Sequence, residues 1–207
     1  MTYRWQIAGR IAETGIVAIV RSASAREAEE ISRTLVGAGI DALEVSLTTP
    51  GALGAIEALA NDLPEALIGA GTVLDGPTAR AAILAGARFL VAPSLRADVI
   101  EMGHRYGVVV APGCQTPTEI ERALSAGADL VKLFPAGQLG PDYLRAVLAA
   151  LPQAPVIPTG GIDASNAAEW LDAGAIGLGV GGALTREAAA APARAAELRD
   201  AVARARR

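Results

Sequence analysis

The stretch ALSAGADLVKLFP at residues 123–135 carries the pattern that decides the fold: a helix-like segment, an Ala-Gly-Ala turn and an apolar run. Glycine just past a helix is the expected C-terminal cap, because it accepts a positive φ without steric cost. The turn recurs as AGI at 38–40 and as AGA at 85–87 and 173–175. Successive turns lie 47, 41 and 47 residues apart, so each interval has room for two strand–helix units of ordinary size.

Eight apolar runs of strand length accompany this repeat, at residues 16–21, 42–47, 66–73, 89–94, 108–113, 130–135, 156–161 and 176–182. Helical stretches separate them, and Ser24 and Thr116 are suitable N-cap residues for two of these helices. Eight such units predict one domain over residues 1–207, a parallel (β/α)8 TIM barrel of the α/β class. Residues 3–14 predict an extra N-terminal helix, and residues 186–205 predict the last helix.

The composition narrows the class of protein. Of 207 residues, 52% are hydrophobic but only 3% are aromatic, so we expect a core of Ala, Val, Leu and Ile. The net charge of -4 offers no positive surface for nucleic acid or an anionic membrane. No segment has the apolar length of a signal peptide or a membrane span, so we expect a cytoplasmic protein. The single cysteine, Cys114, and the single histidine, His104, are expected to be structural, and no zinc site is predicted.

Lys132 is the only lysine among 18 basic residues, and it lies in the middle of the apolar run LVKLFP. Arginine cannot lose its proton in a protein, whereas burial lowers the pKa of a lysine enough for its amine to act as a nucleophile. Strand alternation points Glu44 and Lys132 together into the barrel in the simplest assignment. A structural ion pair is the alternative, but arginine would serve that role equally well. The pair therefore predicts imine chemistry, with Glu44 as general acid and base.

Glycine pairs close the last two predicted strands, as PTGG at 158–161 and GVGG at 179–182. TIM barrels commonly bind phosphate on backbone N–H groups at this place, although glycines also make tight turns. Two pairs on adjacent strands favour phosphate binding. Thr72 and Pro93 end the third and fourth strands, where they are candidates for a hydrogen-bonding group and a rigid wall, or for turn residues alone.

Four segments together resemble the KDPG/KHG aldolase family, which cleaves 2-keto-3-deoxy-6-phosphosugar acids. They are LEVSLTTP at 43–50, IGAGTVL at 68–74, APGCQTPTEIERALSAGADLVKLFPA at 111–136 and IPTGGI at 157–162. The resemblance covers nearly the whole predicted barrel. It implies a class I aldolase without metal or organic cofactor, which acts on a phosphorylated keto acid, releases pyruvate and forms a cytoplasmic homotrimer.

The resemblance also assigns roles to individual residues. Lys132 matches the lysine that forms the Schiff base, and Glu44 matches the glutamate that shuttles protons. The residues that match the lining of the pyruvyl site are Thr72, Pro93 and Phe134. Those that match the phosphate loop are Gly160, Gly161, Gly181 and Gly182.

The sequence divides between two branches of this family. Gluconate-type members carry an arginine at the position of Thr48 and a serine at the position of Gly182. Three features of this sequence resemble the galactonate-type members instead: the TTP turn beginning at Thr48, the arginine at position 21 and the GPDYL segment at 140–144. Thr159, in contrast, resembles the gluconate branch and is a candidate contact for the C4 hydroxyl. The configuration of the substrate at C4 is therefore left open at this point.

The implied reaction begins when the amine of Lys132 attacks the C2 ketone and Glu44 moves the protons. Arg21, Thr48 and Thr72 are candidates for holding the carboxylate of the substrate. Other interpretations are a 4-hydroxy-2-oxoglutarate aldolase, a phosphosugar epimerase or isomerase on the same barrel, a trimeric binding module and a metal-dependent pyruvate aldolase.

Overall fold

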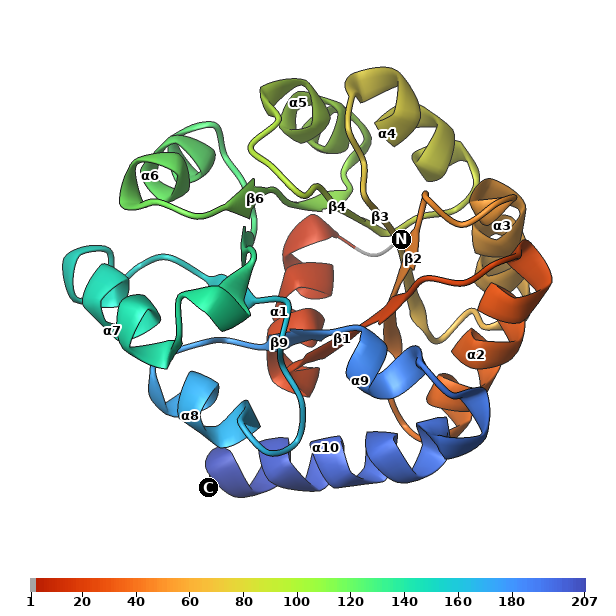
Figure 1. The fold of residues 1–207 in the computed structure, drawn as a ribbon. Helices are drawn as coiled ribbons and strands as arrows, with labels where there is room; N and C mark the ends of the chain where they lie inside the picture. The colour runs from red at the N-terminus through yellow and green to blue at the C-terminus, as the bar shows by residue number, and fades with distance from the viewer. Residues whose placement is uncertain (1–2) are drawn as a thin grey trace.

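The computed structural model describes residues 3–207 of the chain, in which strands alternate with helices (Figure 1). The strands of this part are β1 (Ile16–Val20), β2 (Ala42–Ser46), β3 (Leu67–Gly71), β4 (Phe89–Val91), β5 (Val109–Ala111), β6 (Gly113–Cys114), β7 (Val131–Leu133), β8 (Val156–Pro158) and β9 (Leu178–Val180). The α-helices are α1 (Arg4–Thr14), α2 (Ala25–Gly37), α3 (Ala52–Asp62), α4 (Gly76–Leu84), α5 (Ala97–Tyr106), α6 (Pro117–Ser125), α7 (Pro141–Ala150), α8 (Ala167–Asp172), α9 (Gly182–Thr185) and α10 (Ala191–Ala205). Two 3-10 turns, η1 (Ala136–Gln138) and η2 (Ala188–Ala190), complete the order.

All pairs between these strands are parallel, which confirms the predicted α/β class. The strands form a six-stranded sheet in the order β5-β4-β3-β2-β1-β9 and a three-stranded sheet in the order β6-β7-β8. A bridge between Thr159 and Gly179 links the end of β8 to β9. The single fifth strand predicted at 108–113 is wrong, because it is divided at Pro112 into β5 and β6. Proline has no N–H to donate to a ladder, which explains the break at this residue.

The predicted caps at several helix ends are confirmed, whereas the predicted start of the last helix is wrong. The glycines of the four repeated turns have positive φ values, 84° at Gly39, 99° at Gly86, 89° at Gly127 and 102° at Gly174. The Ser24 hydroxyl accepts a hydrogen bond from the backbone N–H at residue 27 over 3.2 Å. Thr116 and Glu119 cap α6 reciprocally. The last helix begins at Ala191 rather than at 186, because η2 occupies the residues before it.

Helix α1 covers the inner face of the strands at their amino-terminal ends, and it is seen in the middle of the ring of outer helices in Figure 1. Ile7 and Ile11 of this helix are buried in a cluster with residues of the inner face: Val17, Ala42, Leu67, Phe89, Val91, Val109, Ala111, Leu130 and Ile157. Arg4 pairs with Asp129, just before β7, over 3.0 Å, and a second ion pair joins the helix to the start of β2. The interior is therefore closed at this end.

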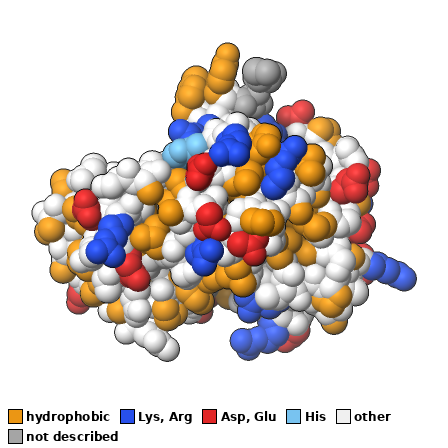
Figure 2. Space-filling view, turned by 90° about the horizontal axis from the view of Figure 1, so that it is seen from above, with side chains coloured by type: hydrophobic (Ala, Val, Ile, Leu, Met, Phe, Trp, Pro, Cys, Tyr) orange, Lys and Arg blue, Asp and Glu red, His pale blue; other side chains and the backbone are white. Residues whose placement is uncertain are grey.

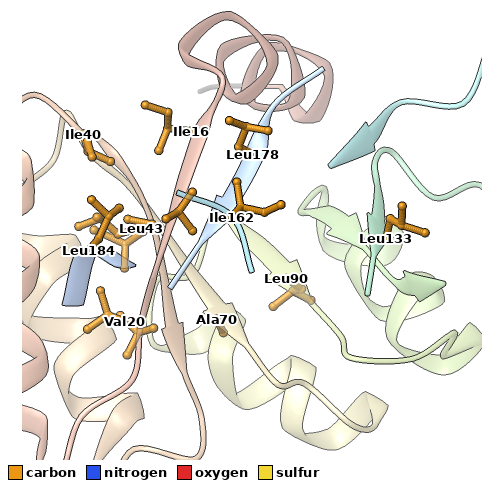
Figure 3. Close-up of a cluster of buried hydrophobic side chains, with 14 of the residues drawn as sticks. Ile16, Val20, Ile40, Leu43, Ala70, Leu90, Leu133, Ile162, Leu178 and Leu184 are labelled. Atoms are coloured by element: carbon orange, nitrogen blue, oxygen red, sulfur yellow. The ribbon is translucent and has the colours of Figure 1, made fainter. Parts of the chain in front are cut away.

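The opposite side of each strand packs against the outer helices. Figure 3 shows part of this second cluster, in which Leu43, Ala70, Leu90, Leu133 and Leu178 come from five different strands. Its buried members are mostly Ala, Val, Leu and Ile, as the low aromatic content predicts. Because side chains alternate along a strand, the residues directly before and after each of these five point to the inner face. Glu44 and Lys132 are among the inward residues, as predicted.

Charges of both signs are interspersed on the face of the molecule shown in Figure 2, with hydrophobic side chains between them. This face has no broad area of positive charge, in agreement with the net charge of -4. Among residues 3–207, no helix combines the length and the apolar character needed to span a bilayer.

Ser32 in α2 yields a test of the packing of the outer helices. Its side chain is fully buried, and its hydroxyl has no hydrogen-bond partner among residues 3–207. Burying an unpaired hydroxyl costs about 1–3 kcal/mol, and alanine is also the better helix former. Ser32→Ala should therefore raise the free energy of unfolding in urea by roughly 1 kcal/mol at a fixed protein concentration. Ser125→Ala, at a surface hydroxyl bonded to Glu121, is the control and should change it by less than about 0.5 kcal/mol. A destabilised Ser32→Ala variant would contradict the assignment.

Candidate active site

Lys132 and Glu44 meet in the interior from opposite sheets. Nζ of Lys132 in β7 lies 3.6 Å from Oε1 of Glu44 in β2. The two side chains are 9% and 4% exposed. The sequence prediction that both residues point inward and lie together is therefore confirmed by the geometry.

The environment of this pair shifts the titration of the carboxyl group. Burial raises the pKa of Glu44, while the positive charges of Lys132 and, more weakly, Arg21 act in the opposite direction. Beneath the pair, a void of about 20 Å³ is lined mainly by apolar side chains that reach Ile11 of α1. A carboxyl group in such a dry site holds a proton more readily than one in water, as a residue that exchanges protons with a substrate requires.

Two glycines on the inner face leave space for side chains of the site. A Cβ atom at Gly71 in β3 would lie 2.0 Å from Oε1 of Glu44, and one at Gly179 in β9 would lie 2.1 Å from Oγ1 of Thr159. Both glycines are therefore parts of the site that sequence reasoning missed. Glycine inside a strand indicates the close approach of another group, and that signal was present in GAG and GVG.

A cavity of about 1210 Å³ opens from this pair at the carboxyl ends of the strands. With one exception, every predicted site residue lines it: Arg21, Glu44, Thr72, Pro93, Lys132, Phe134, Thr159, Gly160, Gly161, Gly181 and Gly182. Thr48 is the exception, because its exposed side chain lies outside the cavity wall. The structure therefore brings the predicted residues together apart from Thr48.

The wall beside the lysine consists of an aromatic ring and a buried hydroxyl. The Phe134 ring centroid lies 5.2 Å from Nζ of Lys132, and the residue is 38% exposed and lines the cavity. Thr159 is buried, and among residues 3–207 its hydroxyl has a single, long contact of 3.5 Å with the carbonyl of Ile157 in β8. That hydroxyl is free to turn toward a bound molecule.

Two glycines that follow β8, Gly160 and Gly161, also line the cavity. Gly160 and Gly161 have φ values of 95° and 76°, which favour glycine. The Gly160 carbonyl accepts a hydrogen bond from the N–H of Gly137 over 2.8 Å. The Asn166 side chain donates to the Gly161 carbonyl over 2.8 Å. Because both carbonyls accept hydrogen bonds, the conformation of this turn is stabilised.

Sequence reasoning missed Arg186 and Arg194, which also line the cavity.

Neither Cys114 nor His104 takes part in the site. Cys114 is buried, and desolvation raises the pKa of its thiol to about 12, so it is no nucleophile at neutral pH. Nε2 of His104 lies 2.7 Å from the carbonyl of Gly127 and ties α5 to the repeated turn. Both residues are structural, as predicted. Residues 3–207 contain no cluster of three or more His, Cys, Asp or Glu side chains arranged to hold a metal ion.

The family model described as KDPG and KHG aldolase matches residues 7–197. The chain belongs to the KDPG and KHG aldolase family. This finding confirms the resemblance inferred from the four sequence segments, and the match extends over both sheets and most of the helix α1 that closes the interior.

Curated relatives represent both branches of the aldolase family. The 2-dehydro-3-deoxy-6-phosphogalactonate aldolase of Escherichia coli K12 is 39% identical over 173 residues, which cover 83% of this chain and 84% of the relative. The 2-dehydro-3-deoxy-phosphogluconate aldolase of Treponema pallidum is 38% identical over 158 residues, 75% of each chain.

Solved structures agree with this assignment. A native KDPGal structure superposes with a TM-score of 0.88 at 36% identity and covers 92% of this chain and 95% of its own. The KDPG aldolase of Legionella pneumophila, with pyruvate captured as a covalent carbinolamine, has a TM-score of 0.83 at 29% identity and 98% coverage of both chains.

The contact between Gly71 and Glu44 predicts a loss of activity on a minimal substitution. In Gly71→Ala, the new methyl group would overlap the carboxylate and displace it from Lys132. Misplacement by about 1 Å costs up to roughly 100-fold in rate, so aldol cleavage should slow by about ten- to 100-fold. Gly54→Ala in α3 is the control, because open space surrounds that position, and its activity should equal that of the wild type. Equal activity of both variants in steady-state assays would show that Glu44 tolerates displacement.

Proposed function

We propose that this protein is a class I aldolase that cleaves a 2-keto-3-deoxy-6-phospho sugar acid to pyruvate and glyceraldehyde 3-phosphate. The observation that carries the proposal is the only lysine of the chain, buried 3.6 Å from a carboxylate at the base of the cavity. Membership in an aldolase family and the carbinolamine found in the Legionella relative support imine formation at this lysine.

In the first half-reaction, the unprotonated amine of Lys132 attacks the C2 carbonyl, and a C–N bond forms as the carbonyl oxygen becomes a hydroxyl. Glu44, at 3.6 Å, gives a proton to that hydroxyl so that it leaves as water and an iminium remains. Because burial raises the pKa of Glu44, the carboxyl group can hold this proton until the step needs it.

Cleavage follows because the iminium is an electron sink. The C4 hydroxyl loses its proton to the Glu44 carboxylate, the C3–C4 bond breaks, and its electron pair moves toward the nitrogen as the aldehyde leaves. The resulting enamine takes a proton at C3. Hydrolysis of the imine then releases pyruvate and restores the amine of Lys132.

The cavity lining offers groups for both charged ends of the substrate. Arg21 and Thr72 line the cavity and are assigned to the carboxylate. The glycine pairs at 160–161 and 181–182 also line it, and their backbone N–H groups are assigned to the phosphate. Holding both ends uses remote binding energy to align the C3–C4 bond with Lys132.

Thr159 and Phe134 are assigned to the middle of the substrate, next to C4 and the pyruvyl group. The proposed substrate is the gluconate or the galactonate epimer at C4. Measuring kcat/KM for each epimer, and for 4-hydroxy-2-oxoglutarate, identifies the preferred substrate.

We further infer that the two sheets form one closed (β/α)8 barrel. The Thr159–Gly179 bridge joins them on one side, and Pro112 is the single residue between β5 and β6 on the other. A cytoplasmic homotrimer remains the prediction from the family resemblance, and analytical ultracentrifugation tests the trimer.

Chemical trapping tests the imine directly. Incubation with pyruvate and borohydride should fix one pyruvate-derived adduct per chain, because Lys132 is the only lysine. A tryptic map should place it between Arg122 and Arg145, with no cut at the modified lysine. Lys132→Arg keeps the charge but has no nucleophilic amine, so it should neither trap pyruvate nor turn over substrate. Lys132→Met serves if arginine does not fit. A wild-type enzyme that cleaves substrate without trapping pyruvate would overturn the class I assignment.

Removing the ionisable group at Glu44 tests the proton shuttle. Glu44→Gln keeps the shape of the side chain, so the fold and the binding of phosphate should persist. Turnover should fall by about two orders of magnitude or more, the scale of general acid–base catalysis. Steady-state kinetics with circular dichroism as the folding control measures this, and turnover near that of the wild type would remove Glu44 from the mechanism.

A further inference from the structure

Three hydroxyl groups form a chain from the surface to the cavity wall. Oγ of Ser46 lies 2.8 Å from Oγ1 of Thr48 and 3.0 Å from Oγ1 of Thr72. Ser46 is fully buried, Thr48 is exposed and Thr72 lines the cavity. Ser46 is therefore the link between an outer hydroxyl in contact with solvent and an inner hydroxyl that faces the proposed substrate.

The backbone explains why Ser46 reaches Thr72. Ser46 is the last residue of β2 and lies opposite Gly71 in β3, two residues beyond Glu44 on the same strand face. Thr72 follows Gly71 and has a φ of 60°, the only positive φ of a non-glycine residue within 3–207. A β-branched residue seldom adopts this conformation, so surrounding contacts must hold it there. The hydrogen bond between Ser46 and Thr72 is one such contact.

The number of hydroxyl protons limits the donor–acceptor direction of the two hydrogen bonds that join Thr48, Ser46 and Thr72. Ser46 has one proton for two hydrogen bonds, so one neighbouring threonine must donate to it. If both threonines donated, the proton of Ser46 would be buried without a partner, which is unfavourable. The chain therefore runs either from Thr48 to Thr72 or in the reverse direction. A carboxylate in the cavity only accepts hydrogen bonds, so it selects the direction that leaves the Thr72 proton free to point at it.

We propose that Ser46 is a positioning residue that donates its proton to Thr72 and thereby turns the Thr72 hydroxyl toward the carboxylate of the keto acid. Thr48 is the outer end of this relay and acts through Ser46 without touching the substrate, which accounts for its place outside the cavity wall. This inference rests on the proposed function, because it concerns the carboxylate of the proposed substrate.

The relay acts on binding more than on the chemical step. The carboxylate does not react, so its contact with Thr72 is made in the ground state and in the transition state alike. Losing an interaction of this kind raises KM and leaves kcat unchanged. The split between KM and kcat therefore separates this role from that of Glu44 or from a general loss of structure.

The experiment compares variants of Ser46 that keep or remove the donor. In Ser46→Ala and in the near-isosteric Ser46→Cys, KM and the pyruvate concentration that half-saturates borohydride trapping should rise about three- to tenfold. The value of kcat should stay within about twofold of the wild type. Ser46→Thr keeps the hydroxyl, so its KM and its half-saturating pyruvate concentration should equal those of the wild type. Ser32→Ala, which removes a buried hydroxyl far from the cavity, is the matched control and should change neither.

A double-mutant comparison tests whether Ser46 acts through Thr72. Thr72→Val should raise KM, and adding Ser46→Ala to it should have no further effect. Thr48→Val should have a smaller effect that disappears in the Ser46→Ala background. Additive effects of these pairs, or an unchanged KM in Ser46→Ala, would overturn the relay. If the wild type traps pyruvate and the relay variants fail these expectations, only this inference is lost, whereas an absence of trapping in the wild type removes the proposed function itself.

Discussion

The contact between Lys132 and Glu44 is the interaction on which the rest of the structure depends. Taking two charges out of water costs several kcal/mol per ion, and a buried pair persists only when its surroundings hold the partners together. Helix α1 closes the amino-terminal end of the interior, and the missing side chain of Gly71 leaves space for the carboxylate. The apolar lining beneath the pair also raises the pKa of Glu44. Closure of one end and the apolar base therefore act together, because both keep the Lys132–Glu44 pair buried.

The site separates chemistry from recognition. The pair to which we assign the chemistry is carried by buried strands, whereas the groups assigned to the charged ends of the substrate lie at or beyond the strand ends. Such a division is typical of barrels, in which loops vary while the strands hold the geometry. The hydroxyls of Ser46 and Thr72 lie where the two regions meet, since Ser46 ends β2 and Thr72 follows β3.

Several features of the site were predictable because they are local or periodic. The turns around Gly39, Gly86, Gly127 and Gly174 need a positive φ that glycine supplies, so they marked the helix ends correctly. Alternation along β2 and β7 placed Glu44 and Lys132 on the inner face, and the structure brings them together. One local prediction was wrong, that of a single continuous strand at residues 108–113. The ladder breaks at Pro112, because proline cannot donate a hydrogen bond, and this loss weighed more than the apolar run around it.

The sequence by itself determined the α/β class, the order of strands and helices, the family and the identity of the central pair. Only the tertiary structure decided which residues share the cavity. Thr48 belongs to the same motif as Glu44, yet it lies outside the wall, while Gly71 and Gly179 matter for the space they leave rather than for any group they carry. Ser46 has one hydroxyl partner two residues further along its own chain segment and another directly after the neighbouring strand β3. Distances between side chains on different strands depend on register and packing across the interior, and a linear pattern contains neither.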